Sequence, residues 1–457
     1  MSFPELGPDG LPSLTVDGPE SEPLRVIDLF AGAGGLSEGF RQAGFQVVAG
    51  SDIDPDACST YAVNFPEGKA ICGDIRVPEI YEQVMDAGQG VDVVVGGPPC
   101  QAFSQVRNHA RLIEDPRNSL YREFVTCVEE LSPTAFVMEN VPGLAQMGVL
   151  EQVTEDLGLS GAYKVKATVV DAADFGVPQT RKRIVFLGVR STARVEVPDL
   201  TGNGATASLA LVRSSKGKYG VELRGESAAN IFERLINPED ESVVSASQAI
   251  SDLRYLRAGR RDDCMAIEDL RPDESAYQRR MRQGLAERLT SVSVPRMNDD
   301  TVIRLRSIPA GGNHRDLPKA LTARYISGQK WGPSTDSGKL GRAHYYAYRR
   351  LHPAIWSWTL NTKADSAYHY AFPRALSVRE TARLQSFPDH FVFTTDPQRG
   401  NIPGRIDGGA AHSRYRQVGN AVPPLLAAGI AKQVATLIRS ARMGYEPNER
   451  RSRAVGS

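Results

Sequence analysis

Short apolar runs alternate with segments of helical spacing over the first 190 residues. The apolar runs are rich in Val, Ile, Leu and Phe and have the length of buried strands. In chain order they lie at 24–30, 45–54, 91–97, 135–140 and 183–190. The segments of helical spacing lie at 35–44, 55–65 and 119–131. Because strands that alternate with helices favour a parallel sheet with right-handed crossovers, the pattern predicts an α/β fold.

The alternation stops near Arg190. Residues 191–230 are rich in Gly, Ser and Thr, and the stretch up to about 370 has no regular period. A short αβ segment is expected to return at "RALSVRETARLQSF" and "AVPPLLAAGIAKQVATLIRSA". We therefore expect an α/β core that is interrupted by an irregular domain. The expected parts are a flexible leader at 1–22, the core at 23–190, the irregular domain at 191–370, the C-terminal part of the core at 371–440 and a flexible tail at 441–457.

The net charge does not indicate a charged partner such as a nucleic acid, because Lys+Arg and Asp+Glu both number 54. Residues 271–350 nevertheless carry 16 Lys/Arg against 7 Asp/Glu, which suits a polyanion, although many charge runs are only solvated faces. Five scattered cysteines without a CxxC pair argue against a disulfide framework or a zinc cluster and for a reducing compartment. No run approaches the length needed to span a bilayer, and no signal segment is present. We expect a soluble, intracellular protein.

The loop "VIDLFAGAGGLSEGF" places Gly32, Gly34 and Gly35 between a strand and a helix. Glycines there permit a tight turn and a close backbone approach to a ligand at the carboxyl edge of the sheet. No Gly-Lys-Ser/Thr follows, so this is not a phosphate loop. Asp52, some 20 residues on, is placed to bind ribose hydroxyls, and Asp74 is placed to accept from an adenine amino group. Each feature alone also fits a tight turn or a capping residue, but together they predict a nucleoside site.

A candidate nucleophile, Cys100, follows Pro98 and Pro99 in "GGPPCQAFS". The prolines fix the backbone ahead of the thiol, which would hold a nucleophile in place, although small buried cysteines are common. Glu139 ends another predicted strand at the same sheet edge, and "PQTRKR" offers Gln179, Arg181 and Arg183. The two arginines share one face of an extended segment, where a surface ion pair is the commoner fate. Beside a cysteine and a glutamate, they favour a site with a nucleophile, an acid and a cation.

The chain resembles the DNA (cytosine-5)-methyltransferases of bacteria. The resemblance rests on eight blocks in the order of that family, which span residues 28 to 424. They are "DLFAGAGGLSEGF", "SDIDP", "GDI", "GGPPCQAFS", "ENV", "PQTRKRIVFLG", "RALSVRETARLQSFPD" and "YRQVGNAVPP". The resemblance implies a Rossmann-like S-adenosylmethionine-dependent methyltransferase core, and it makes the irregular domain at 191–370 a target-recognition domain.

The resemblance also implies a role for each motif residue. Cys100 would attack C6 of a flipped-out cytosine, Glu139 would hold the N3/N4 edge of the ring, and Arg181 and Arg183 would stabilise charge on the O2 side. The residues implied to bind DNA are Gln101, Ser104 and Gln179. The residues implied to bind S-adenosylmethionine are Phe30, Gly32, Gly34, Gly35, Leu36, Asp52, Ile53, Asp74, Ile75 and Asn420.

The implied function is methylation of cytosine C5 within a specific short sequence of double-stranded DNA. The implied setting is a bacterial restriction-modification or phage-defence system, with a cytoplasmic, nucleoid-associated monomer that uses no metal and no membrane. Two alternatives stay open, a tRNA cytosine-5 methyltransferase and a catalytically silent DNA-binding regulator on the same fold. The chain departs from the family pattern at "HPAIWSWTLNT", where we expect Trp356 and Trp358 to belong to the core. A second departure is the long insert 394–413 before Tyr415.

Overall fold

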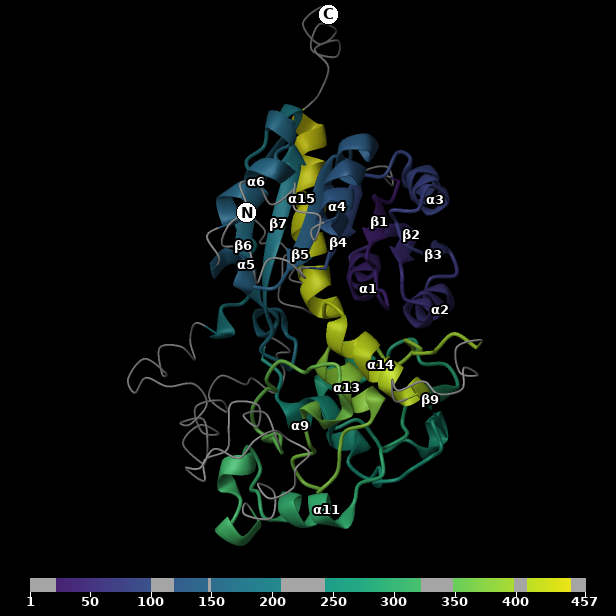
Figure 1. Ribbon diagram of the computed structural model, residues 1–457, viewed down its shortest axis with the longest axis vertical. Coiled ribbons are helices and arrows are strands. Elements are labelled where there is room, and N and C mark those ends of the chain that lie inside the picture. The colour runs from purple at the N-terminus through teal and green to yellow at the C-terminus, as the bar shows by residue number, and fades with distance from the viewer. Residues whose placement is uncertain are drawn as a thin grey trace, which may run out of the picture.

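The computed structural model describes residues 22–99, 119–146, 149–206, 243–321, 348–397 and 409–444. Its centre is a seven-stranded sheet in the order β3-β2-β1-β4-β5-β7-β6 (Figure 1). The strands are β1 (Arg25–Leu29), β2 (Gln46–Asp52), β3 (Lys69–Cys72), β4 (Val93–Gly96), β5 (Ala135–Asn140), β6 (Tyr163–Asp171) and β7 (Lys182–Arg190). The five predicted strands, and with them the α/β fold, are confirmed.

The sheet is mixed rather than parallel throughout. Strands β1 to β5 run parallel, as predicted, whereas β7 runs antiparallel to β5 and β6 runs antiparallel to β7. The expected parallel direction is therefore wrong for β7, because an apolar run does not encode its direction, and β6 was not predicted as a strand. The reversal brings the start of β7 to the edge where β5 ends, since Asn140 pairs with Ile184.

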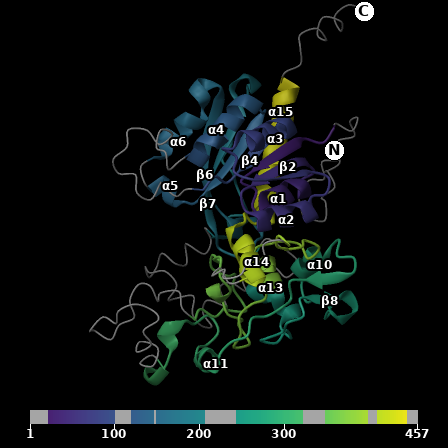
Figure 2. The same cartoon turned by 45° about the vertical axis from the view of Figure 1, so that its right-hand side comes forward.

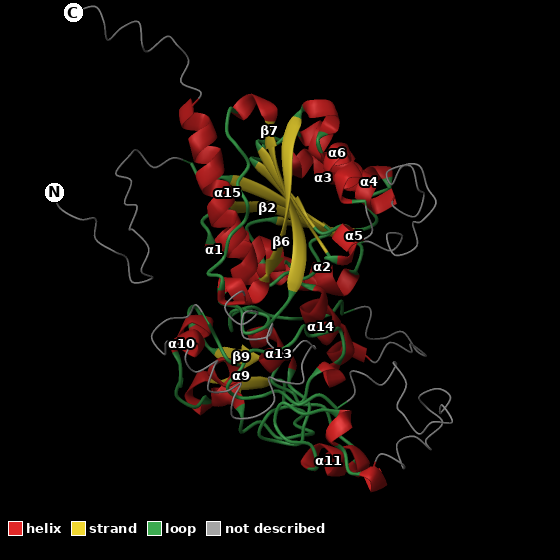
Figure 3. Ribbon diagram, turned by 90° about the vertical axis from the view of Figure 1, so that its left-hand side faces the viewer, coloured by secondary structure: helices red, strands yellow, loops and turns green. Residues whose placement is uncertain are grey.

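Helices cover both faces of the sheet. Figure 3 shows α1 and α15 on one face, with α3, α4 and α6 on the other. Two clusters of buried side chains follow these faces: Phe40 of α1 and Val26 of β1 belong to one, and Phe124 of α4 and Ile27 of β1 belong to the other. The helices are α1 (Gly35–Gln42), α2 (Pro55–Asn64), α3 (Pro78–Gly88), α4 (Ser119–Leu131), α5 (Gly143–Gln146), α6 (Leu150–Leu157) and α15 (Pro424–Gly444).

The C-terminal helix α15 packs closely against α1. A Cβ added to Gly39 of α1 would lie 2.3 Å from the Cβ of Ala427, so only glycine allows this approach. The stretch His412–Arg442 is long and apolar enough to cross a membrane by length and composition, which the sequence analysis did not expect. Its most apolar window is 72% buried inside the protein. The apolar character of this stretch is therefore explained by packing in the core.

A second region lies below the sheet in Figures 1 and 2 and has little regular structure. It is held by buried ion pairs, since Arg383 contacts Asp252 (2.6 Å) and Asp389 (2.7 Å) and all three side chains are fully buried. Its core is continuous with that of the sheet, because Ile250 belongs to the same cluster as Val26. Its main elements are α9 (Ala246–Ile250), β8 (Cys264–Ala266), α10 (Ala276–Arg282), β9 (Arg288–Thr290), α11 (Asp299–Arg306) and α13 (Val378–Leu384).

The described residues of 371–444 form helices α13, α14 (Gly409–Asn420) and α15, with one isolated bridge between Tyr368 and Ala375. The predicted αβ segment is thus helical, and its strand component is wrong. Trp356 is buried beside Ala173, which confirms its place in the core. Trp358 is half-buried against the larger cluster that contains Val26, and it donates a hydrogen bond to the Ser366 carbonyl (3.2 Å). Part of the insert 394–413 lies outside the described residues.

Candidate active site

The glycine-rich loop after β1 has an unusual backbone. Phe30 (φ 59°), Gly32 (φ 54°) and Gly34 (φ 94°) all adopt left-handed conformations, which glycine tolerates best. The Gly32 N–H donates to Oδ2 of Asp52 at 2.8 Å, so the end of β2 fixes the loop. Phe30, Gly32 and Leu36 line a cavity at this edge of the sheet.

Gly34 and Gly35 lie outside the cavity lining and face the protein. A Cβ on Gly34 would lie 2.4 Å from the ring of Phe65, and one on Gly35 would lie 2.2 Å from the carbonyl oxygen of Val422. Both glycines are required by close packing. Their direct contact with a cofactor stays a prediction.

The ends of β2 and β3 supply carboxylates and apolar side chains to the same cavity. Asp52 accepts from Gly32 and, through Oδ1, from the Asp54 N–H (2.8 Å), while burial raises the pKa of its carboxyl group. Ile53 is 63% exposed, which is unusual for a large apolar side chain. Asp74 and Ile75 follow β3, and the hydrogen bonds from Arg76 lower the pKa of the Asp74 carboxyl group.

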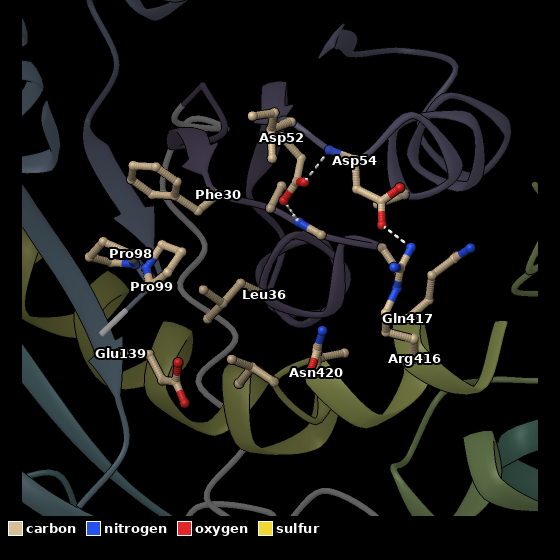
Figure 4. Close-up of a pocket in the computed structure, with 18 of the residues that line it drawn as sticks. Phe30, Leu36, Asp52, Asp54, Pro98, Pro99, Glu139, Arg416, Gln417 and Asn420 are labelled. Carbon is tan, nitrogen blue, oxygen red and sulfur yellow. Dashed lines mark hydrogen bonds and ion pairs between the residues drawn. The ribbon is translucent and has the colours of Figure 1, made fainter. Parts of the chain in front are cut away.

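An ion pair lies where β4, β5 and β7 meet at this edge. Nε of Arg183 lies 2.6 Å from Oε1 of Glu139, and each side chain is 13% exposed. The antiparallel direction of β7 is what brings Arg183, near its start, to the end of β5. Pro98 and Pro99 lie at the end of β4 in the lining of the same cavity (Figure 4). The predicted residues Cys100, Gln101 and Ser104 lie outside the described residues.

Arg181 lines the cavity, and its guanidinium binds backbone carbonyls of α14 and of Leu360, while its predicted role at the cytosine ring stays a prediction. Its Nη2 donates to the carbonyls of Gly419 (2.9 Å) and Asn420 (3.4 Å), and its Nη1 donates to that of Leu360 (3.4 Å). Burial, helped by the neighbouring charge of Arg183, lowers the pKa of this guanidinium to about 9. Arg181 therefore joins the end of α14 to the start of β7.

Gln179 is fully buried and lies outside the cavity lining. Its Nε2 donates to the Leu384 carbonyl (3.1 Å), and its Oε1 accepts from the Leu360 N–H (2.9 Å). Its role as a DNA contact stays a prediction, while these bonds favour a structural role.

Several residues that line the cavity were not predicted as site residues from the sequence. Asn420 was predicted, whereas its neighbours Arg416 and Gln417 were not, although helical spacing puts 416 and 420 on one face. Asp54 lies inside the "SDIDP" block but was given no role. The segment 359–362 also lines the cavity; it ends "HPAIWSWTLNT", which was noted only as a departure from the family pattern and was given no role at the site.

These residues enclose one cavity of about 650 Å³. Figure 4 shows Asp52 and Phe30 on one side of it, Glu139 with Pro98 and Pro99 on another, and α14 along the wall. Groups of three or more His, Cys, Asp or Glu arranged to hold a metal ion are absent from the part of the chain that the structure describes. A sheet of this order, with a glycine-rich loop after β1 and carboxylates after β2 and β3, agrees with the S-adenosylmethionine-dependent methyltransferase fold that the sequence motifs imply.

The comparisons with known proteins give the family. The family described as "C-5 cytosine-specific DNA methylase" matches residues 24–436. The type II methyltransferase M1.HphI of Haemophilus parahaemolyticus is 32% identical, over 90% of this chain and 86% of its own length. The type II methyltransferase M.XorII of Xanthomonas oryzae pv. oryzae is 31% identical, over 90% and 85%.

A solved structure agrees with these relatives. The crystal structure of a putative DNA modification methyltransferase encoded within an Escherichia coli prophage superposes with a TM-score of 0.63 and 25% identity, over 91% of this chain and 99% of that one. The chain belongs to the C-5 cytosine-specific DNA methylase family. It is a DNA (cytosine-5-)-methyltransferase, and enzymes of this family take the methyl group from S-adenosylmethionine.

Proposed function

We propose that the cavity holds both reactants of cytosine C5 methylation. The observation that carries this proposal is the continuity of the cavity, which Asp52 and Ile53 line together with Glu139 and Arg183. The methyl donor would lie on the β1–β3 side, and a cytosine flipped out of the duplex would lie against the Glu139–Arg183 pair. Such an arrangement would bring the methyl group close to C5.

The residues on the β1–β3 side fit S-adenosylmethionine. The exposed side chain of Ile53 offers an apolar surface to an adenine ring, and burying it would remove apolar area from water. Asp52 keeps lone pairs for ribose hydroxyls beyond its two backbone bonds, because a carboxylate has about four acceptor sites. Asp74 would accept from the adenine amino group, and Asn420 would close the pocket from α14. When bound, S-adenosylmethionine supplies an electrophilic methyl group.

The chain's own residues would make C5 nucleophilic. The thiolate of Cys100 would add to C6 and form a C–S bond, which turns C5 into an enamine-like carbon that takes the methyl group. Water would then remove the C5 proton, and the electron pair of the C5–H bond would re-form the C5=C6 double bond and expel the thiolate from C6. Pro98 and Pro99 support this role, because two prolines limit the backbone freedom ahead of Cys100.

Glu139 and Arg183 would bind the cytosine ring during these steps. The Glu139 carboxyl group would hold the N3/N4 edge and share a proton with N3, which favours addition at C6. Arg183 would donate to O2, since one guanidinium carries five N–H donors and can contact Glu139 and O2 together. Gly97 supports this geometry, because a Cβ there would lie 3.1 Å from Oε2 of Glu139. Arg181 would act through the backbone of α14.

We further propose that the target is a short sequence of double-stranded DNA, read by the region between β7 and α13. The basic block at 271–350 supports this, because it could neutralise phosphates. The relatives named type II methyltransferases support a restriction-modification setting in the bacterial cytoplasm, at the nucleoid. The protein would act as a monomer without a metal ion.

The test is to express the protein in a host that lacks cytosine methylation and to sequence its genome after bisulfite treatment. We expect protected cytosines within one short motif, and no protection with Cys100→Ala, because the covalent step needs the thiolate. Equal protection with Cys100→Ala would refute the covalent role. A folded protein that binds S-adenosylmethionine but protects no cytosine would refute the proposed DNA target and favour tRNA or a silent regulator.

A further inference from the structure

Arg416 joins the last part of the chain to the first at the edge of the cavity. It lies in α14, and its guanidinium forms an ion pair with the carboxylate of Asp54, in the loop after β2. Both residues line the cavity, with 32% of the Arg416 side chain and 24% of the Asp54 side chain exposed. Figure 4 shows the pair beside Asp52. The ion pair therefore spans two walls of one pocket.

Asp54 belongs to the same short loop as Asp52 and Ile53. Its N–H donates to Oδ1 of Asp52 (2.8 Å), and its own Oδ1 accepts from the Asp56 N–H (3.1 Å) as the N-cap of α2. Since Oδ1 caps the helix and Oδ2 pairs with Arg416, the ion pair restrains the whole loop. Ile53 is held at the cavity wall by this restraint.

Three further contacts join α14 to α2. The guanidinium of Arg416 also lies 4.0 Å from Oδ2 of Asp56, a longer and weaker ion pair than the one with Asp54. The hydroxyl of Ser413 donates to Oδ2 of Asp56 (2.5 Å), and that of Thr60 donates to Oε1 of Gln417 (2.6 Å). Residues 413, 416 and 417 lie on one face of α14, because positions three and four apart are neighbours on a helix. Of these four described contacts, the Arg416–Asp54 pair has both partners in the cavity lining. It is the contact placed to act on a bound ligand.

We propose that Arg416 is a positioning residue for the methyl donor, which it retains by tying α14 to the Ile53 loop through Asp54. The proposal rests on the proposed cofactor role of this cavity. A cofactor seated between the two walls leaves more slowly when the walls are tied together. A half-buried ion pair is worth more than a fully exposed one, because it is screened less. Its loss should therefore speed cofactor release.

The test is a double-mutant cycle with Arg416→Gln, Asp54→Asn and the double variant. Asn is a good N-cap, so Asp54→Asn removes the charge and keeps the cap of α2. We expect each single variant to raise the Kd for S-adenosylmethionine about fivefold, and the double variant to raise it no further, because both remove the same interaction. Calorimetry without DNA gives Kd, stopped-flow chase gives the release rate, and thermal unfolding reports on folding.

Arg442→Gln is the matched control. It removes an ion pair between α15 and Asp92 that lies outside the cavity lining, and its Kd should equal that of the wild type. Single variants whose Kd stays within twofold of the wild type, or effects that add in the double variant, would overturn the proposal. Wild-type protein that fails to bind S-adenosylmethionine would instead refute the proposed cofactor role.

Discussion

Asp28 is a fully buried carboxyl group beneath the glycine-rich loop. Its Oδ2 accepts from the Ser37 hydroxyl (2.7 Å) and the Ser37 N–H (3.1 Å), so it anchors the start of α1 to β1. The Ser37 hydroxyl also lies 2.9 Å from the hydroxyl of Tyr61. Burial raises the pKa of Asp28 from 3.8 to about 7, although the bonds from Ser37 act in the opposite direction. The glycine-rich loop is thus followed by a helix that is anchored to the Asp28 carboxyl group, whose pKa burial raises to about 7.

Asp28→Asn should change how stability depends on pH. Between about pH 4 and 7 the folded protein binds the Asp28 proton and the unfolded chain does not, so this group's contribution to stability falls as pH rises through that window. Asn is neutral and keeps an acceptor for Ser37. The free energy of unfolding of the variant, relative to the wild type, should rise by a few kcal/mol from pH 5 to pH 8, at about 1.4 kcal/mol per pKa unit. Urea unfolding at several pH values measures this, and a difference independent of pH would contradict it.

At the scale of elements, the contact between α1 and α15 depends on Gly39. A methyl group there would lie 2.3 Å from the Cβ of Ala427 and 2.5 Å from the carbonyl oxygen of Pro424. Gly39→Ala should therefore lower the free energy of unfolding by about 1–3 kcal/mol, the usual cost of overpacking a core. The control is Gly143→Ala at the start of α5, where an added Cβ meets nothing within 4 Å. Equal stability of the two variants in denaturant titrations would refute this account of the packing.

The strands that could be predicted from the sequence are those whose own residues form a continuous apolar run. β1, β2, β4, β5 and β7 are short and apolar, and all were predicted. β6 was missed because Lys164 and Lys166 interrupt its apolar pattern, as an edge strand allows. The direction of β7 was missed because it depends on the connection through β6, which the pattern of β7 does not contain.

The residues of the candidate site also fall into two groups, those that a local motif reveals and those that only a tertiary contact reveals. Asp52, Glu139 and Arg183 stand at strand ends beside recognisable motifs, and they line the cavity together. Arg416 pairs with a residue more than 360 positions away in the sequence, so no local pattern could reveal that contact. Gln179 belongs to a motif, but its burial depends on tertiary neighbours such as Leu384. The motifs predicted which residues lie together at the cavity, whereas tertiary packing determines the contacts that each side chain makes.

At the scale of the whole molecule, α14 lies between the sheet and the second region (Figures 1 and 2). Arg416 pairs with Asp54 on the sheet side, while Arg414 pairs with Asp263, just before β8 in the second region. The two arginines are about 200° apart around the helix axis, at about 100° per residue. Asp263 also accepts from the hydroxyl of Ser293 (2.7 Å), so Arg414 contacts an already fixed part of that region. The two faces of α14 thus bond to different parts of the protein, one to the proposed cofactor side and the other to the proposed DNA-reading side.

Substituting the two arginines separately should therefore affect different ligands. Arg414→Gln removes the ion pair that joins α14 to Asp263 of the second region, and we expect the Kd for a duplex with the target motif to rise about fivefold, with the Kd for S-adenosylmethionine unchanged. Arg416→Gln should raise the Kd for S-adenosylmethionine by more than the Kd for DNA. Fluorescence anisotropy at fixed salt measures DNA binding, and calorimetry measures cofactor binding. If Arg414→Gln raises both dissociation constants equally, the two faces of α14 are not independent, and the helix transmits each contact to the opposite side.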